Sequence, residues 1–200
     1  MTHENHENDI YGQEDLEPTA ESQAGLRPSI YVASLSDYNA GRLHGVWIDA
    51  TQDIEAVYTA VEDLLRSSAE PGAEEFAIHD YEDFGAVRFS EYEKLETVVR
   101  IAQGIAEHGK PFAGWASHLG EREWDDHLDD FADCYLGSYD SMEDYAAQIL
   151  DDLGVDIDNL GPEYLRPYIR FDLEGLASDL SLDVAVEQDD AGVHIFLNHE

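Results

Sequence analysis

The sequence predicts an α+β protein that is elongated and divided into about three small subdomains, and three observations support this fold class. Alternating apolar side chains and turn residues occur near both ends of the expected folded region, whereas the middle keeps a helical spacing. The hydrophobic content of 43% is enough for a core. The charge is unusual, because 46 acidic residues against 10 basic residues give −36, and self-repulsion at this density opposes a compact body.

The N-terminus is expected to be a disordered acidic tail that spans residues 1–28. Residues 1–26 contain seven acidic residues, no lysine or arginine, and few aliphatic side chains. Without them, 39 acidic and 10 basic residues remain, a balance of −29. The tail therefore does not explain the charge of the chain.

An N-terminal α+β subdomain is expected over residues 29–88. The stretches SIYVASL and LHGVWID each read as a strand, and the turn-rich DYNAG lies between them. Asp53 is placed to cap a helix whose apolar residues keep a helical period as far as Leu65. The segment EFAIHDYE, residues 75–82, then predicts a third strand.

Two helices are expected at the start of the middle subdomain. Ser90 and Glu93 have the capping-box pattern ahead of a helix that closes near Gly109. A shorter helix begins at Pro111 and ends at Gly120.

The middle subdomain, residues 89–135, is expected to end in a third helix. Its sequence EREWDDHLDDFAD, residues 121–133, contains seven carboxylates and one arginine. The apolar side chains fall at helical spacing and predict one buried stripe with an acidic remainder: Trp124, Leu128, Phe131 and Tyr135.

A C-terminal α+β subdomain is expected over residues 136–200. Ser141 and Asp144 form a second capping signal, and Gly154 is typical of the stop of the helix that follows. Short helices interrupted by prolines and a glycine are expected between residues 160 and 180. The chain ends in a hairpin, VAVEQ and HIFLN, around Asp-Asp-Ala-Gly. Five aromatic residues of the whole chain are expected in the core: Trp47, Trp115, Trp124, Tyr145 and Phe171.

The charge limits the partners that the protein can bind. A strongly negative surface disfavours nucleic acid and anionic membranes, and it favours a protein with a basic surface. Cys134 is the only cysteine, so no internal disulfide is expected, and a reducing cytoplasm fits. No signal segment and no long apolar run is visible, so the expected location is the cytoplasm.

The acidic residues are concentrated as well as numerous. Residues 121–158 contain fourteen acidic residues and one basic residue, whereas ordinary surfaces mix both signs. A helix over residues 121–133 would span about 20 Å and carry roughly one carboxylate every 3 Å. Duplex DNA has about one phosphate charge per 1.7 Å of axis, so the −29 of the ordered region corresponds to roughly 50 Å of duplex. Because a compact globule of about 170 residues is only about 40 Å across, an elongated body is favoured.

The sequence shows no recognisable catalytic or metal-binding motif. The best calcium candidate, residues 156–167, has Leu160 at a ligand position and Pro167 where a bidentate glutamate belongs. The nine histidines form no zinc pattern, and His79 beside Asp80 is more typical of a hydrogen-bonded strand residue than of a catalytic base. No nucleophile-elbow, Walker or dinucleotide motif occurs. We therefore expect no catalytic residue, no metal and no cofactor.

The sequence also resembles the ArdA antirestriction proteins. The strand–YNxG–strand opening and the segment AIHDYE are fairly specific to that family, and the resemblance covers residues 28–200. The matching stretches are IYVASLSDYNAGRLHGVWID (30–49), EEFAIHDYEDF (74–84), FADCYLGSYDSMEDYAAQIL (131–150), LRPYIRFDLEGLASDLSLD (165–183) and GVHIFLN (192–198).

The resemblance implies an acidic DNA mimic, not an enzyme, of the kind that mobile genetic elements use to evade host defence. It implies a curved, three-part monomer that forms a homodimer through its C-terminal part. The dimer would occupy the DNA channel in the methyltransferase core of type I restriction–modification enzymes. Cys134, Tyr135 and Tyr139 lie beside a family-like segment and are candidates for the dimer seam.

The carboxylates expected to imitate DNA phosphates would act collectively. Five lie in the first half of the chain: Asp80, Glu82, Asp83, Glu91 and Glu93. Ten lie in the second half: Asp125, Asp126, Asp129, Asp130, Asp133, Asp140, Glu143, Asp144, Asp151 and Asp152.

Two other interpretations of the composition are open. Acidic surfaces and scarce lysine, here only Lys94 and Lys110, are general in proteins of a high-salt cytoplasm. Such an ordinary acidic domain should unfold in dilute buffer, whereas a mimic should stay folded there. A metal-binding acidic protein is the second alternative, and calcium titration by calorimetry would reveal it.

Overall fold

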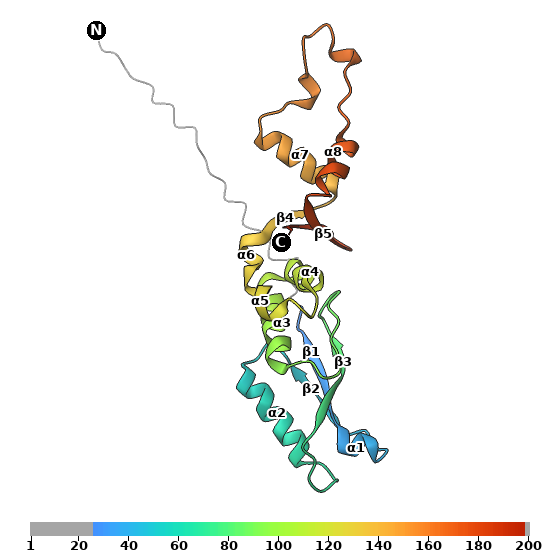
Figure 1. Cartoon of the computed structure of the whole chain (residues 1–200). Coiled ribbons are helices and arrows are strands. Elements are labelled where there is room, and N and C mark those ends of the chain that lie inside the picture. Colours follow the sequence, from blue (N-terminus) through green and yellow to red (C-terminus); the bar gives the residue numbers. More distant parts are fainter. Residues whose placement is uncertain (1–25, 199–200) are drawn as a thin grey trace, which may run out of the picture.

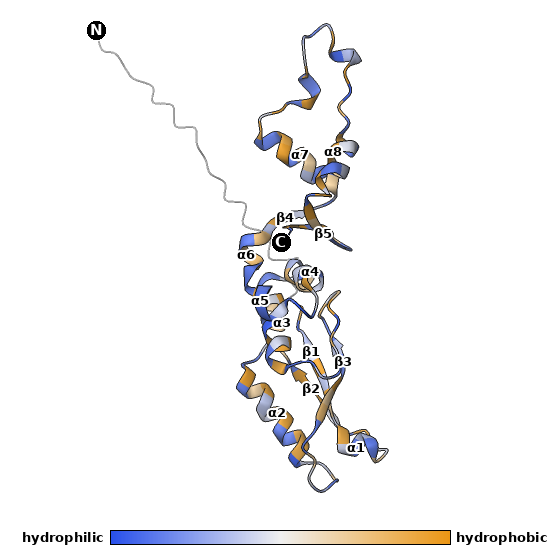
Figure 2. Cartoon of the chain, in the orientation of Figure 1, coloured by the Kyte–Doolittle hydropathy of each residue, from blue (hydrophilic) through white to orange (hydrophobic). Residues whose placement is uncertain are grey.

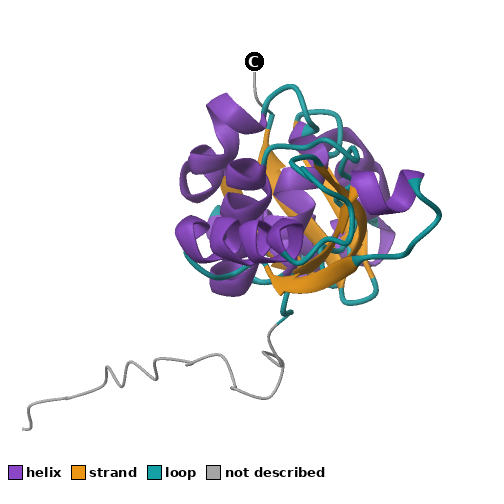
Figure 3. Cartoon of the chain, turned by 90° about the horizontal axis from the view of Figure 1, so that it is seen from below, coloured by secondary structure: helices purple, strands orange, loops and turns teal. Residues whose placement is uncertain are grey.

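The computed structural model describes residues 26–198 and confirms the α+β class. Most of the predicted acidic tail, residues 1–25, lies outside the described residues. Figure 1 shows an elongated chain, with the N-terminal sheet at one end, helices in the middle and the C-terminal elements at the other end. Viewed along this axis in Figure 3, the same chain has a compact outline. The subdomain boundaries after residues 28, 88 and 135 stay predictions.

Three antiparallel strands form the N-terminal sheet, in the order β2-β1-β3. They are β1 (Ser29–Ser34), β2 (Gly45–Asp49) and β3 (Phe76–Glu82), so the three predicted strands are confirmed. The predicted helix is α2 (Ile54–Arg66), which packs against β1 and β2. The side chains buried on that face of the sheet include Ile30, Val32, Ile48 and Ile78.

The turn-rich segment after β1 contains a short helix, α1 (Leu35–Asn39), rather than a loop alone. Ser34 caps this helix, because its Oγ accepts a hydrogen bond from the Asp37 backbone N at 3.4 Å. Gly41 then turns the chain at φ +78°, a conformation that favours glycine. The prediction of a plain turn was wrong because Ser-x-x-Asp resembles a helix-start signal as well.

Asp37 of α1 is a buried carboxylate, only 1% exposed, and it connects this helix to two other segments of the chain by hydrogen bonds. It accepts hydrogen bonds from Ser68 and from Arg42. The Ser68 hydrogen bond is the main cause that lowers its pKa from 3.8 to about 2, and Ser34 and Arg42 act in the same direction against the effect of burial. Because the folded pKa lies below the unfolded one, the ionised group stabilises the fold above the unfolded value of 3.8.

We therefore expect the stabilisation from Asp37 to be lost as the pH falls from about 4 to about 2. Asp37→Asn should lower the midpoint of urea unfolding at neutral pH, and the difference from the wild-type protein should shrink across that acidic window. A difference of equal size at every pH would show that the charge of this carboxylate does not stabilise the fold.

Two helices form the first part of the middle. α3 (Leu95–His108) ends at Gly109 and α4 (Lys110–Leu119) ends at Gly120, which confirms both predicted stops. Gly109 has φ +70°, so the chain reverses from α3 into α4 at a residue that tolerates this conformation. The two helices pack against each other.

The start of α3 differs from the predicted capping box. Lys94 precedes the first helical residue, and no side chain caps the helix there. The carbonyl of Ser90 accepts a hydrogen bond from the Glu93 N at 3.2 Å in a separate turn. The Glu93 carboxylate bonds the Lys94 N at 3.1 Å, so it does not reach back to Ser90.

The acidic stretch is not the single helix that the sequence predicts. It forms three short turns: α5 (Trp124–His127), η1 (Leu128–Asp130) and α6 (Phe131–Cys134). The break falls at His127, whose φ of −125° lies outside the helical range. Carboxylates one turn apart repel each other in a regular helix and aspartate is a weak helix former, so packing rather than propensity decides the path.

The predicted apolar stripe is nevertheless the buried side of this stretch. Trp124, Leu128 and Phe131 are at most 6% exposed. Tyr135 leaves the helical path and begins β4 (Tyr135–Tyr139), a strand that was not predicted. Its ring stacks on Phe131 with 5.1 Å between the ring centroids.

The C-terminal sheet has the order β4-β6-β5. The predicted hairpin is confirmed as β5 (Val184–Asp189) and β6 (Gly192–Leu197). The predicted helix is α7 (Met142–Asp152). The second capping signal is also confirmed, because Ser141 Oγ accepts a hydrogen bond from the Asp144 N at 3.1 Å.

A long connection joins α7 to the final hairpin. Gly154, at φ +71°, ends α7 as predicted. The connection contains η2 (Ile157–Asn159), η3 (Arg166–Tyr168) and α8 (Leu173–Leu180). In Figure 1, the chain between α7 and α8 extends to the far end of the molecule.

Two hydrophobic clusters hold these elements together. The larger cluster joins the N-terminal sheet, α2 and the helices from α3 to α6, and it reaches the last hairpin through Ala185 and Phe196. The smaller cluster lies in the C-terminal part around Tyr145, Val193 and Ile195. Figure 2 shows apolar and hydrophilic residues interleaved along α2 and α7, as expected for helices with one buried side.

Three of the five aromatic residues expected in the core are buried: Trp115, Trp124 and Tyr145. The prediction is wrong for Trp47 and Phe171, which are 44% and 38% exposed. Trp47 lies next to buried Ile48 on β2 and therefore points to the face opposite α2, whereas Phe171 lies in the connection before α8. Alternation identifies the two faces of a strand but not which of them is covered.

Candidate acidic interface

The candidate carboxylates of the first half lie on β3 and in the loop that follows it. Asp80 and Glu82 are exposed on β3. Asp83 follows at φ +63°, an unusual backbone conformation for a residue other than glycine. In the loop, Glu91 is exposed and Glu93 is half-buried.

The acidic stretch distributes five more candidates over three short turns. Asp125 and Asp126 belong to α5, Asp129 and Asp130 belong to η1, and Asp133 belongs to α6. All except Asp130 are exposed. Because the backbone changes geometry between these turns, the carboxylates do not repeat at regular helical intervals.

The remaining candidates lie at both ends of α7. Asp140 precedes the helix, and Glu143 and Asp144 lie in its first turn, where negative charge is favourable. Asp151 and Asp152 lie in the last turn, where a negative charge opposes the helix dipole. All five are exposed. Asp151 and Asp152 do not stabilise α7 through the helix dipole, which fits a role in binding.

These positions divide the candidates into two sets. In Figure 1, α5, α6 and α7 follow one another along one side of the body, whereas β3 lies on the other side in that view. The elements on the first side, with the residue just before α7, carry ten of the candidates, and we call this set the acidic ridge: Asp125, Asp126, Asp129, Asp130, Asp133, Asp140, Glu143, Asp144, Asp151 and Asp152.

Two basic residues at α3 fix part of the ridge. Lys94 Nζ lies 2.6 Å from Asp125 Oδ2, and Arg100 Nη2 lies 3.1 Å from Asp129 Oδ1. The hydrogen bond and the charge of Lys94 lower the pKa of Asp125. The partners are 31 and 29 residues apart in the sequence, so no local pattern could have identified Lys94 and Arg100.

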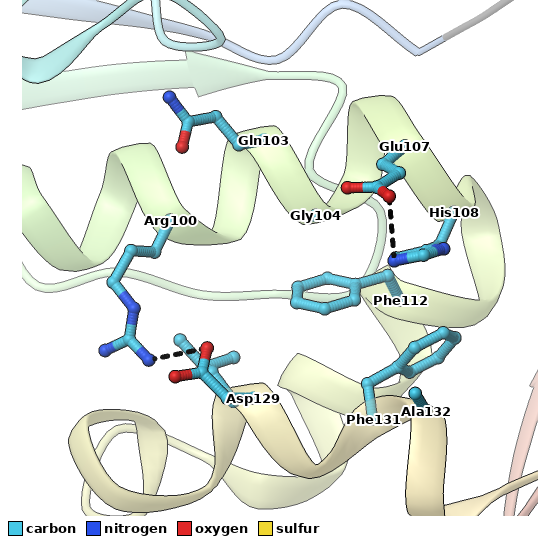
Figure 4. Close-up of a pocket in the computed structure, with 10 residues that line it drawn as sticks. Arg100, Gln103, Gly104, Glu107, His108, Phe112, Asp129, Phe131 and Ala132 are labelled. Atoms are coloured by element: carbon cyan, nitrogen blue, oxygen red, sulfur yellow. Dashed lines mark hydrogen bonds and ion pairs between the residues drawn. The ribbon is translucent and has the colours of Figure 1, made fainter.

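A cavity of about 300 Å³ lies beside this contact, between α3 and the turns η1 and α6. Figure 4 shows the ion pair of Arg100 and Asp129 on one side and the rings of Phe112 and Phe131 on the other. The centroids of these two rings are 5.2 Å apart. The acidic stretch is thus attached to the helices by apolar packing and by an ion pair, and the fold determines where its carboxylates lie.

Many of the basic side chains form intramolecular ion pairs. At least five of the ten basic residues form ion pairs with carboxylates: Arg42, Arg66, Lys94, Arg100 and Lys110. Within residues 26–198, no ion pair of 4 Å or less involves Asp126, Asp133 or Asp140. The negative field of these ridge carboxylates is therefore not cancelled locally.

The candidates for a dimer seam are half-buried within the chain: Cys134, Tyr135 and Tyr139. Burial, together with the charges of Asp130 and Asp133, raises the pKa of the Cys134 thiol. Tyr135 packs against the larger hydrophobic cluster and Tyr139 against the smaller one. Their role in a dimer seam stays a prediction.

Three residues of the C-terminal sheet have the residue types of a nucleophilic triad. Ser138 Oγ lies 2.6 Å from His194 Nδ1, and His194 Nε2 lies 3.4 Å from Asp189 Oδ2. In serine hydrolases the serine faces Nε2 and the acid faces Nδ1, which is the reverse arrangement. Ser138 and His194 are register partners on β4 and β6, so their contact follows from strand pairing. We interpret the Ser138–His194 hydrogen bond as a polar contact between β4 and β6.

Within residues 26–198, no group of three or more histidine, cysteine or acidic side chains is arranged to hold a metal ion. Asp156, from the calcium candidate, instead caps η2, since its Oδ1 accepts hydrogen bonds from the backbone N of Asp158 and Asn159. No helix in the described part of the chain is long and apolar enough to cross a membrane.

An elongated body in which acidic side chains far outnumber basic ones defines a class of protein, a polyanion suited to a basic protein surface. The family model described as antirestriction protein (ArdA) matches residues 30–194. The chain therefore belongs to the ArdA family of antirestriction proteins, which confirms the resemblance seen in the sequence. A comparison with curated proteins gave no match.

Proposed function

We propose that the protein imitates the charge and shape of bent duplex DNA and inhibits type I restriction–modification enzymes by occupying their DNA channel. Membership of the ArdA family supports the antirestriction activity. The observation that carries the mimicry is the placement of the elements that bear the acidic ridge, because α5, α6 and α7 follow one another along the long axis of an elongated body.

The proposed mechanism is occupancy rather than catalysis. Lysine and arginine side chains of the methyltransferase core, which are placed for phosphates, would meet carboxylates held by the fold. Attraction between opposite charges raises the encounter rate, and salt screens that attraction, so the affinity should fall as ionic strength increases.

The proposed active form is a homodimer joined through the C-terminal part, which would extend the ridge over two copies. β4 is an edge strand of its sheet, and an edge strand can pair with a strand of a second chain. Tyr135 and Tyr139 begin and end this strand, and Cys134 precedes it. Because the target acts on intracellular DNA, the proposed place of action is the cytoplasm.

A competition experiment tests this function. The purified protein is mixed with a type I methyltransferase bound to its labelled DNA site, and DNA displacement is measured as the salt concentration rises. We expect displacement at low salt that weakens steadily with added salt. Poly-aspartate of the same net charge is the control, since it carries the charge without the fold. If the protein fails to displace DNA from several such enzymes at low salt, the proposal is wrong.

A single neutralised carboxylate of the ridge should have little effect. Asp126→Asn removes one exposed charge, and exposed charges contribute about 0–1 kcal/mol each, which corresponds to at most about fivefold in affinity. The competition experiment measures this directly. A loss of about a hundredfold from this one change would show a specific contact instead of a collective field.

A further inference from the structure

The N-terminal sheet has an open face on the side opposite α2, and this face combines aromatic and acidic side chains. The strand register arranges them in rows across β2, β1 and β3. The first row consists of Trp47, Tyr31 and Asp80. The second row consists of Asp49, Ser29 and Glu82.

The aromatic pair on this face is ordered and partly exposed. Trp47 is 44% exposed, and its ring centroid lies 5.5 Å from that of Tyr31 at an interplanar angle of 53°. The Tyr31 ring lies over Gly45, where an added Cβ would come within 2.6 Å of the ring. The Tyr31 ring therefore fits at this position only because residue 45 has no side chain. The same ring packs against Trp47.

The carboxylates on this face are not neutralised by basic side chains of the described residues. In the described chain, no ion pair of 4 Å or less involves Asp49, Asp80 or Glu82. Asp49 accepts hydrogen bonds from the N and Oγ1 of Thr51, at 2.9 and 2.6 Å, so its carboxylate is held in place. All three carboxylates are exposed.

An exposed indole on a sheet face that also bears exposed carboxylates suits a guanidinium group. The planar cation stacks on an aromatic face, and its N–H groups bond a carboxylate at the same time. Tryptophan, tyrosine and arginine are also the residues that contribute most to binding at protein interfaces. A lysine ammonium has neither the planar stacking surface nor the two parallel donors.

We propose that this open face is a second contact surface, which receives an arginine side chain of the basic partner between Trp47 and the carboxylates of β3. The inference rests on the proposed function, because the partner is the same restriction–modification enzyme. The acidic ridge supplies long-range attraction, whereas this face supplies a short-range contact that depends on shape. Salt screens the second contribution less than the first.

Removal of the indole tests this surface. Trp47→Ala should weaken DNA displacement about tenfold or more, and the loss should persist as salt rises, whereas Trp47→Phe should keep part of the affinity. The matched control is Tyr58→Ala, which removes an aromatic ring that is 38% exposed on α2, on the opposite side of the same sheet. We expect no change in displacement for this control.

The possible outcomes separate the two proposals. If the wild-type protein does not displace DNA at all, the proposed function fails. If the wild-type protein displaces DNA and Trp47→Ala does so equally well, only the contact at this face is wrong. A loss of the same size from Tyr58→Ala would also overturn this contact, because the effect would then not be specific to the open face.

A spectroscopic measurement tests the same contact without removing the indole ring of Trp47. Trp115 and Trp124 are 0% and 2% exposed, so Trp47 is the tryptophan that a neutral quencher such as acrylamide reaches. The chain is labelled with 5-hydroxytryptophan, which absorbs to the red of the tryptophans of the target. We expect the quenching of the free protein to be largely lost in the complex. Unchanged quenching in a complex that displaces DNA would overturn the inference.

Discussion

A variant that neutralises four carboxylates of the acidic ridge together is expected to displace DNA roughly thirtyfold less well than the wild-type protein. The four are Asp126, Asp133, Asp140 and Glu143, each changed to its amide. All are exposed. Losses of about 0.5 kcal/mol at each position add to about 2 kcal/mol if the field acts collectively. The dependence of affinity on salt should become shallower as well, because fewer charges take part.

The control for this variant has the same net charge but a different distribution. It neutralises four exposed carboxylates outside both candidate sets: Glu55, Glu74, Glu174 and Asp179. We expect a much smaller loss of displacement, since these groups do not belong to the ridge. If both variants weaken displacement equally in the competition experiment, total charge rather than the ridge determines binding.

The substitution Trp124→Ala should destabilise the protein by about 3–5 kcal/mol. Trp124 is 2% exposed, its Nε1 donates a hydrogen bond to the Ala116 carbonyl oxygen at 2.7 Å, and its ring centroid lies 5.5 Å from that of Phe89. Truncation would leave a cavity under the acidic stretch and remove one of two hydrogen bonds to the Ala116 carbonyl oxygen, which also accepts one from the Gly120 N at 3.2 Å. Urea unfolding at neutral pH measures the free energy of unfolding.

A second tryptophan variant provides the comparison. Trp47→Ala, on the open face of the N-terminal sheet, should cost much less stability because its side chain is 44% exposed. A cost below about 1 kcal/mol for Trp124→Ala would show that the acidic stretch does not depend on this anchor.

Local signals in the sequence predicted the parts of the fold that local geometry controls. The stops at Gly109, Gly120 and Gly154 follow from backbone conformations that glycine tolerates. The start of α7 follows from the hydroxyl of Ser141, which bonds a backbone N three residues away. These features need no knowledge of the rest of the chain.

Features that depend on distant contacts could not be predicted in this way. The period of Trp124, Leu128 and Phe131 identified the buried side of the acidic stretch, but the same period fits one long helix and three short turns. Tyr135 left the predicted helix because β6, about 60 residues later, pairs with it as a strand neighbour. The exposure of Trp47 depends on which side of the sheet α2 covers.

The candidate interface was predictable as a region but not in its charge distribution. Composition identified residues 121–158 as the most acidic part of the chain. Composition alone assigns Asp125 and Asp129 the same negative charge as the neighbouring carboxylates. In the folded protein, however, Lys94 and Arg100 neutralise these two side chains through ion pairs. The effective charge of the ridge therefore comes mainly from the carboxylates that the fold leaves without a basic neighbour.

Residues 153–172 connect α7 to α8 without a single buried side chain. Extra or missing residues in this connection would leave both hydrophobic clusters intact, and the entropy of closing a loop changes only slowly with its length. Insertions and deletions accumulated during evolution should therefore concentrate between these two helices. Such changes in length would leave the spacing of the carboxylates on α5, α6 and α7 unaltered.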